Sequence, residues 1–433
     1  MPDSKFSSSK SFLKLIKSSN KSLTPAQIKA VDRLFEYDHT ILVAGTGVGK
    51  TIIALSAISE LLAERILQRV IVACPAKVLE TEVWPNEITK WSHLTNVSIT
   101  QLKGTAEQRS KLLRTSKANI LVVSLNNLDW LLQQHHSANG IIIDELSKAA
   151  GKQTAGLKSK KKSGSFIWRV GMTATPVSQN FEKLYGMARI IDGGKSLGTN
   201  RQKFLQEYFY PDYMGYNWTL KGFADAKIME KVASLVYLMD NNKVKVLPAK
   251  RESLLRFAMP EKTRLEYDAM RKHLVAGDIE AANEAVKSGK LRQIASGFMY
   301  DGKRTVHLDH ARLDCAREWW TRLNGRSGLI FYEFIEQLEQ LRIAPSNIRV
   351  AQINSMSHGI DGLQDEFADV LFYQPVWSRD AAEQAVGRVW RQGQKQDVTV
   401  STLICTNTLD DLVIARVEDR AMWMKIFTQH LKG

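Results

Sequence analysis

The feature that most restricts the fold of this chain is a glycine-rich loop between two apolar runs. The loop follows the run Thr40 to Val43, precedes the helix-compatible run Ile52 to Leu62, and contains Gly45, Thr46, Gly47, Val48, Gly49, Lys50 and Thr51. Glycines let backbone N–H groups turn toward a phosphate, and a following helix N-terminus adds partial positive charge. Lys50 can then reach the β- and γ-phosphates of a nucleotide, and Thr51 can offer a hydroxyl to Mg²⁺. The sequence therefore predicts a strand, a phosphate-binding loop and a helix; the alternative is a glycine-rich turn with an unrelated lysine.

Length and charge limit the class of protein. A chain of 433 residues predicts two or three domains, and 60 Lys and Arg against 45 Asp and Glu give a net charge of +15, which favours a polyanionic partner. No apolar run approaches the roughly 20 residues that span a bilayer, so we expect nucleic acid rather than a membrane. The start of the chain has no secretory apolar segment, and the cysteines, Cys74, Cys315 and Cys405, lie far apart. We expect a reducing compartment and three buried, unligated thiols.

Hydrophobic patterning divides the first half of the chain into a tail and a lobe. Residues 1–20 are rich in Ser and Lys and are expected to form a flexible basic tail. From Leu23 to about Val170, apolar runs at 70–73, 120–123, 141–143 and 166–170 alternate with helix-period stretches. Continuous apolar strands that alternate with helices predict a parallel sheet covered on both faces.

A second α/β lobe is expected after a helical segment. Residues 180–300 are mostly helical in pattern and include the helix-former run Asp278 to Lys290. Four further apolar runs, at 328–332, 349–353, 370–373 and 398–402, follow without a second phosphate loop. We therefore expect a first lobe over residues 21–240 with a helical insertion, a connection near Asn241 to Arg251, and a second lobe over residues 241–433.

Polar residues follow two of the predicted strands in the first lobe. Asp144 and Glu145 come directly after the run at 141–143, where ligands of parallel sheets bind. Asp144 can hold Mg²⁺, and Glu145 can polarise the water that attacks the γ-phosphate. Thr173 and Thr175 follow the next strand and could sense the γ-phosphate, although a simple Thr/Pro turn is the alternative.

The second lobe carries arginines at helical spacing. On a helix, Gln384, Arg388 and Arg391 would share one face. Guanidinium groups in a lobe without a phosphate loop are suited to complete a nucleotide site on the other lobe, where they stabilise charge on the transferring phosphoryl group. The alternative is a solvated basic helix face.

The order of these segments resembles helicase superfamily 2, and the details resemble its Swi/Snf-type branch of double-stranded-DNA translocase ATPases. The general set is Gln27, the loop at 45–51, Asp144-Glu145, Thr173 to Pro176 and Gln384 to Arg391; the branch is indicated by Cys74-Pro75, Trp84, Glu87 and Lys90-Trp91, and by Trp377 with the block from Gln384 to Gln394. The resemblance covers Leu23 to about Asp411. It implies two RecA-like parallel-sheet lobes in tandem, the ATP site in the cleft between them, and Gln27, Asp361 and Gln384 beside the nucleotide.

Several positions depart from the family pattern. Ala26 stands where an aromatic often precedes the glutamine, and Ala44 stands where the strict loop pattern has glycine. The loop lacks the acids common in the family, and Leu146-Ser147 follows the carboxylate pair in place of Ala-His. The segment from Ser357 to Gln364 resembles the glycine-rich fifth motif with one extra residue. These departures indicate a compact, divergent member of bacterial or viral type.

The resemblance also implies where nucleic acid lies. Backbone phosphates would be contacted by Pro75, Lys77, Ser124, Tyr332 and Ser357, which position the polynucleotide without reading its sequence. A lysine cluster, formed by Lys158, Lys160, Lys161 and Lys162, precedes the strand at 166–170. It is expected to be a mobile basic hook on the duplex; a solvated loop or a nuclear-localisation signal are the alternatives.

Together these features predict an ATP- and Mg²⁺-dependent motor. We expect it to translocate on double-stranded DNA without strand separation, with Lys50, Glu145, Arg388 and Arg391 as catalytic residues and Thr51 and Asp144 as metal ligands. The alternatives are a strand-separating DNA or RNA helicase, or a motor-fold factor that remodels a nucleic-acid-bound protein such as RNA polymerase. The expected location is the cytoplasm of a bacterium or virus-infected cell, with the nucleus as the alternative.

Overall fold

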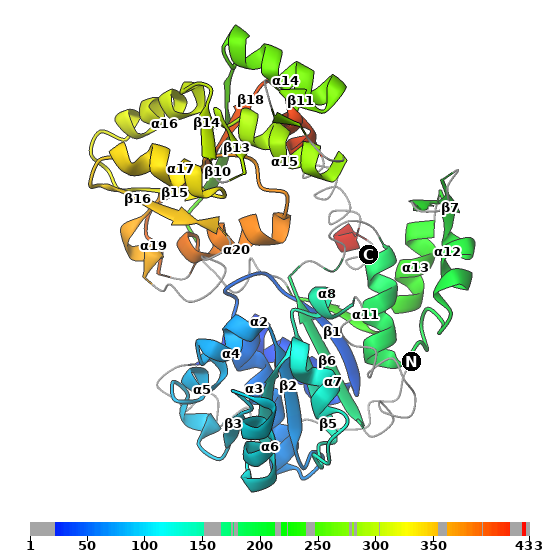
Figure 1. Cartoon of the computed structure of the whole chain (residues 1–433). Helices are drawn as coiled ribbons and strands as arrows, with labels where there is room; N and C mark the ends of the chain where they lie inside the picture. The colour runs from blue at the N-terminus through cyan, green and yellow to red at the C-terminus, as the bar shows by residue number, and fades with distance from the viewer. Residues whose placement is uncertain are drawn as a thin grey trace. The chain divides into compact units, whose positions relative to one another are not determined.

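The chain folds into two compact units, which the computed structural model of residues 1–433 shows in Figure 1. The structure describes residues 22–150, 166–174, 176, 181–212, 218–222, 224–239, 247–276, 279–280, 284–302, 304–353, 362–391, 393–415 and 427–429. The first unit comprises residues 1–245 and 420–433, and the second comprises residues 246–419. Each unit has its own parallel sheet.

The sheet of the first unit has seven strands in the order β3-β4-β2-β5-β6-β1-β9, all parallel. They are β1 (His39–Val43), β2 (Val70–Cys74), β3 (Ile99–Gln101), β4 (Ile120–Ser124), β5 (Gly140–Asp144), β6 (Trp168–Thr173) and β9 (Val236–Leu238). Successive residues of one strand belong to different cores: Ile41 packs in one cluster and Leu42 in the other. A strand that alternates between two apolar layers is buried on both faces, as the continuous apolar runs predict.

Helices supply both apolar layers of the first unit. They are α2 (Pro25–Glu36), α3 (Lys50–Ala63), α4 (Ala76–Glu80), α5 (Val83–Ile88), α6 (Ala106–Thr115), α7 (Leu128–Leu131), α8 (Leu146–Ala149), α11 (Glu182–Asp192), α12 (Arg201–Tyr208) and α13 (Ala224–Val232). Helices α2 and α3 belong to one core, and α11, α12 and α13 belong to the other, next to the antiparallel hairpin β7 (Phe209–Pro211) and β8 (Trp218–Leu220). The expected helical insertion after residue 180 is therefore present in this unit.

The sheet of the second unit has five parallel strands in the order β10-β18-β17-β15-β16. They are β10 (Lys250–Phe257), β15 (Gly328–Tyr332), β16 (Ile348–Gln352), β17 (Asp369–Phe372) and β18 (Val398–Cys405). The helices are α14 (Glu261–His273), α15 (Glu284–Ile294), α16 (Ala311–Arg322), α17 (Ile335–Gln340), α19 (Leu363–Glu366) and α20 (Arg379–Val389). Two antiparallel hairpins accompany them: β11 (Val275–Ala276) with β12 (Ile279–Glu280), and β13 (Phe298–Asp301) with β14 (Arg304–His307).

The observed elements confirm the two parallel sheets and correct two details. The run Asp278 to Lys290 was expected to be one helix, but α15 begins only at Glu284, after the β11–β12 hairpin. The second lobe was expected to extend to residue 433, whereas Phe427 packs in a core of the first unit. Two of the three cysteines, Cys74 and Cys405, are buried as expected, and Cys315 is only partly buried. Among the described residues, no helix is long and apolar enough to cross a membrane.

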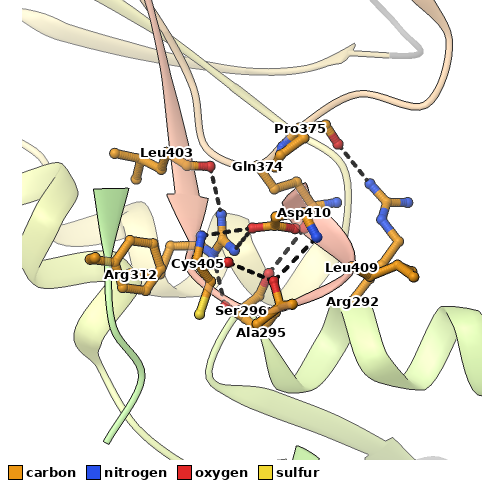
Figure 2. Close-up of polar contacts among 12 residues, drawn as sticks. Arg292, Ala295, Ser296, Arg312, Gln374, Pro375, Leu403, Cys405, Leu409 and Asp410 are labelled. Atoms are coloured by element: carbon orange, nitrogen blue, oxygen red, sulfur yellow. Dashed lines mark hydrogen bonds and ion pairs between the residues drawn. The ribbon is translucent and has the colours of Figure 1, made fainter. Parts of the chain in front are cut away.

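A buried ion pair joins distant parts of the second unit. Arg312 on α16 is 1% exposed, and its Nη2 donates to Oδ2 of Asp410, which is 3% exposed, over 2.5 Å. The same guanidinium donates to the carbonyls of Ala295 (3.0 Å), Tyr373 (2.7 Å) and Leu403 (3.2 Å), as Figure 2 shows for the surrounding cluster. Because the carboxylate also accepts from the Cys405 N–H (3.0 Å), this pair fixes the ends of β17 and β18 against α16.

Breaking this pair is expected to destabilise the second unit strongly. Asp410→Asn keeps the side-chain volume but leaves the Arg312 guanidinium buried without its counter-charge, a change that costs about 3–5 kcal/mol. Thermal unfolding of the purified chain should show this loss. The matched control is Glu318→Gln, which removes the exposed Arg322–Glu318 pair (3.0 Å) on the same helix and should cost about 0.5 kcal/mol or less. Equal losses for the two variants would contradict a stabilising role for the buried pair.

Candidate nucleotide site

The glycine-rich loop has the backbone of an anion cradle. It begins after β1 and ends where α3 starts at Lys50, and Gly47 (φ 66°) and Gly49 (φ 85°) are both left-handed. The Lys50 ammonium donates to the carbonyls of Ala44 (3.1 Å) and Gly45 (3.0 Å), so its side chain folds back over the loop. A left-handed glycine turn that leads into a 14-residue helix is a backbone arrangement with which N–H groups can bind a phosphate. The predicted strand, loop and helix are thus confirmed in geometry.

Gln27 connects the first helix of the unit to this loop. Its Nε2 donates to the Val48 carbonyl (2.9 Å), and its Oε1 accepts from the Thr24 N–H (2.9 Å). The Thr24 hydroxyl accepts from the Gln27 N–H (3.3 Å), which completes a capping box at the start of α2. The sequence placed Gln27 beside the nucleotide, and the structure places its amide against the phosphate loop.

The position of Gln27 explains why residue 49 is glycine. A Cβ added at Gly49 would lie 2.6 Å from Gln27 Nε2, and the left-handed backbone costs an L-residue roughly 1–2 kcal/mol. We expect Gly49→Ala to weaken ATP binding by about 5- to 30-fold, measured by titration with a fluorescent ATP analogue. Gly193→Ala is the matched control, because Gly193 has a similar φ (72°) with nothing within 4 Å of its Cβ position. It should lower stability and leave ATP affinity unchanged; an equal loss of affinity in both variants would refute the contact argument.

The carboxylate pair lies at the end of β5, in the same sheet as the loop. Asp144 is the last residue of the strand and 9% exposed, and its Oδ1 accepts from the Glu145 N–H (3.1 Å). Burial and the neighbouring Glu145 carboxylate raise the pKa of Asp144, while the Lys50 ammonium opposes that rise. Glu145 has a left-handed backbone (φ 56°, ψ 55°), which is uncommon for a residue with a side chain and concentrates at functional sites.

The donor set fits a magnesium ion. A divalent cation would compensate the negative charge of a buried carboxylate. Mg²⁺ is usually bound by one or two carboxylates together with phosphate oxygens. Asp144 supplies the carboxylate at the end of β5, and Thr51 supplies a hydroxyl in the first turn of α3. Both groups predicted to hold the ion therefore lie at the carboxyl end of the same sheet.

Thr173 belongs to the same edge. It is the last residue of β6, is fully buried, and is paired in register with Val43 of β1. Its carbonyl accepts from the Ala44 N–H (3.0 Å), so the strand end is fixed directly to the first residue of the phosphate loop. The partner predicted to act with it, Thr175, lies outside the described residues.

The predicted nucleic-acid contacts of the first unit follow the ends of β2 and β4. Pro75 and Lys77 lie at the start of α4 and are partly buried. Ser124 ends β4, is 4% exposed, and accepts a hydrogen bond from Asn127 Nδ2 (3.0 Å). Lys158, Lys160, Lys161 and Lys162 lie outside the described residues. The structure therefore gathers three of these seven residues at the ends of two strands that pair with each other.

The second unit corrects the expected arginine face. Gln384 and Arg388 lie on α20, but the helix ends at Val389 and its C-cap Trp390 has ψ 76°. Arg391 therefore follows the helix rather than sharing its face. Tyr332 ends β15 and is partly buried, whereas Ser357 and Asp361 lie outside the described residues.

A polar cluster at the carboxyl ends of β15 and β17 escaped the sequence analysis. Arg292 on α15 makes two 2.6 Å bonds to the Glu333 carboxylate and donates to the Pro375 carbonyl (3.0 Å). Gln374 Nε2 donates to the same carboxylate (2.9 Å), and Figure 2 shows the bond from Arg292 to the Pro375 carbonyl. The sequence did contain an indication of this cluster: Glu333 directly follows the apolar run at 328–332, in the same way that Asp144 follows the run at 141–143. The cluster fixes the segment that leads into α20.

Comparison with known proteins identifies the family. A model of the SNF2-related domain matches residues 26–309, about two thirds of the chain. Protein p41 of Acyrthosiphon pisum secondary endosymbiont phage 1 is 26% identical, over 94% of this chain and 98% of the phage protein. The ATP-dependent helicase MG018 of Mycoplasma genitalium is 22% identical, over 86% of this chain and 38% of that protein.

Two further similarities extend over most of this chain. The CHD3-type chromatin-remodeling factor PICKLE of Arabidopsis thaliana is 22% identical, over 91% of this chain and 33% of that factor. A solved structure of the Sulfolobus solfataricus SWI2/SNF2 ATPase core in complex with dsDNA is 20% identical, over 95% of this chain and 94% of that one, with a TM-score of 0.46. The family predicted from the motifs is thus confirmed by the domain model. The chain belongs to the SNF2-related family of ATP-hydrolysing motors that act on nucleic acid.

Proposed function

We propose that this chain hydrolyses ATP in order to move along double-stranded DNA without separating its strands. The observation that carries the proposal is the assembly, at one edge of the first sheet, of the phosphate loop, the buried Asp144 and the strained Glu145 in an SNF2-related domain. The net charge of +15 supports a polyanionic track.

Each residue of this edge has a defined task in the proposed reaction. The loop N–H groups and Lys50 bind the β- and γ-phosphates, and Thr51 and Asp144 hold Mg²⁺, which neutralises charge that develops on the phosphates. Glu145 orients the attacking water and accepts its proton. Thr173, fixed to the loop through Ala44, passes the state of the γ-phosphate into β6.

The second unit is proposed to supply positive charge to the same reaction. Arg388 and Arg391 would approach the γ-phosphate when the two units close, and Gln384 and Asp361 would lie beside the nucleotide. Hydrolysis removes the contacts that hold this state, so the two units separate again and the chain advances on its track.

Nucleic-acid contact is proposed for both units. Pro75, Lys77 and Ser124 of the first unit, and Tyr332 and Ser357 of the second, are the residues that the family resemblance assigns to backbone phosphates. The lysines at 158, 160, 161 and 162 would add a salt-dependent, sequence-independent contribution. We place this action in the cytoplasm of a bacterial or virus-infected cell, in keeping with the phage relative.

Displacement of a triplex-forming strand tests duplex movement directly. A labelled third strand bound to a DNA duplex should be released in the presence of ATP, while the two duplex strands stay paired; Lys50→Ala should release nothing. Release of a labelled complementary strand instead would indicate a strand-separating helicase. ATP-independent binding to RNA polymerase by Lys50→Ala, with no triplex release by the unaltered chain, would indicate a protein-remodelling factor.

A further inference from the structure

The residue between the two catalytic arginine positions is tied to the start of the second unit. Trp390 follows α20 directly, and its N–H donates to the Val386 carbonyl (2.8 Å) as the helix ends. Its indole Nε1 donates to the carbonyl of Pro248 (2.9 Å), which is 142 residues earlier in the sequence. The Lys250 ammonium lies 5.3 Å from the centre of the same ring, within cation–π range.

A second set of contacts fastens the same two segments together. Oδ1 of Asp397 accepts from the Ala249 N–H (3.0 Å), and Oδ2 accepts from Arg251 Nη2 (3.2 Å). The Val398 N–H donates to the Ala249 carbonyl (2.8 Å), where β18 begins to pair with β10. Residues 248–251 therefore contact both ends of the segment 390–398: Trp390 at its start, and Asp397 and Val398 at its end.

The intervening turn is fixed to the core of the unit. Gln394 is buried, and its Nε2 donates to the carbonyls of Phe367 (2.8 Å) and Val389 (3.3 Å). Its Oε1 accepts from the N–H groups of Lys395 and Gln396 (2.8 Å each). Gln394 and Trp390 thus lie on either side of Arg391 in the sequence, and the indole bond connects the residue before the arginine to the start of the second unit.

We propose that Trp390 is a positioning residue. Its indole bond to the Pro248 carbonyl fixes the backbone of the adjacent Arg391 relative to the first residues of the second unit. The proposal rests on the role of Arg391 proposed above. Residues 248–251 lie close in sequence to the boundary between the units, and the indole bond links them to the residue next to Arg391. An indole that only filled space would need its ring but not its N–H.

Trp390→Phe separates these two roles, because it keeps an aromatic ring over Lys250 and removes only the N–H donor. We expect a fall of about 10- to 100-fold in kcat for DNA-stimulated ATP hydrolysis, with KM for ATP unchanged, since misplacement of a catalytic group by about 1 Å has effects of this size. The melting temperature should stay close to that of the unaltered chain. The matched control is Trp168→Phe, which removes a buried indole bond to the Leu34 carbonyl (2.8 Å) in the first unit. It should lower the melting temperature and leave kcat unchanged.

A double-mutant cycle with Arg391→Ala, followed by single-turnover hydrolysis, identifies the residue through which Trp390 acts. If Trp390 acts through Arg391, the effect of Trp390→Phe should disappear in the Arg391→Ala background. A normal kcat for Trp390→Phe, or a full additive loss in the double variant, would overturn this inference while the proposed function stands. A normal kcat for Arg391→Ala would instead refute the proposed arginine role, which makes the two failures distinguishable.

Discussion

Replacing Arg388 or Arg391 by alanine is expected to lower kcat for ATP hydrolysis by roughly 10³–10⁵-fold, the range known for arginines that stabilise charge on a transferring phosphoryl group. The expectation follows from the charges that the described part of the first unit places at its site. Its described site places the Lys50 ammonium at the phosphate loop, and a reaction that spreads charge over three phosphoryl oxygens gains from further fixed donors. Arg388 lies in the last turn of α20, and Arg391 lies three residues beyond it.

The two arginine variants should keep their affinity for ATP nearly unchanged, because the proposed contacts strengthen only as the γ-phosphate is transferred. Steady-state kinetics with saturating duplex DNA would separate kcat from KM. The matched control is Arg322→Ala, which removes an exposed guanidinium from α16 of the same unit. If Arg388→Ala and Arg391→Ala hydrolyse ATP as fast as Arg322→Ala does, the second unit supplies no charge to the reaction.

Glu145→Gln is expected to lower kcat by about 10²–10⁴-fold, the usual contribution of a positioned general base. The amide has the shape of the carboxylate but cannot accept a proton from the attacking water. ATP binding should persist, since the loop, Lys50 and Asp144 are untouched. Nucleotide titration should therefore show normal affinity in a chain that has nearly ceased to turn over.

Glu82→Gln is the control for backbone conformation. Glu82 also has a left-handed backbone (φ 54°) at the start of a helix, but its carboxylate forms an ion pair with Lys103 (2.7 Å) away from the loop. This variant should retain full activity. Equal activity of Glu145→Gln and the unaltered chain would show that another group activates the water.

The sequence was sufficient to predict the sheets because their strands are buried on both faces. Runs such as 70–73 and 120–123 are apolar at every position, and they appear as β2 and β4 with nearly the expected bounds. The edge strand β10 was not predicted, because Lys250–Phe257 alternates exposed and half-buried residues and carries three charges before Ser253. The three-residue strand β9 was too short to give a pattern.

The site was predictable in its residue types but less so in its geometry. The spacing of glycines, Lys50 and Thr51 predicts the cradle, yet nothing local indicates that Gln27 lies against Val48. Periodicity extended the arginine helix to residue 391, whereas the helix stops at Val389, next to the residue bonded to Pro248. Both features involve contacts between residues that lie 21 and 142 positions apart in the sequence, and a local sequence pattern does not encode such contacts.

The measurement that tests the account most directly is the rate of ATP hydrolysis with duplex DNA, single-stranded DNA, RNA or no polynucleotide. The account predicts that duplex DNA stimulates hydrolysis most, and that Lys50→Ala and Glu145→Gln abolish the stimulated rate. Hydrolysis that persists in both variants would contradict the assignment of the site. Stimulation by single strands or RNA above that by duplex DNA would contradict the duplex track.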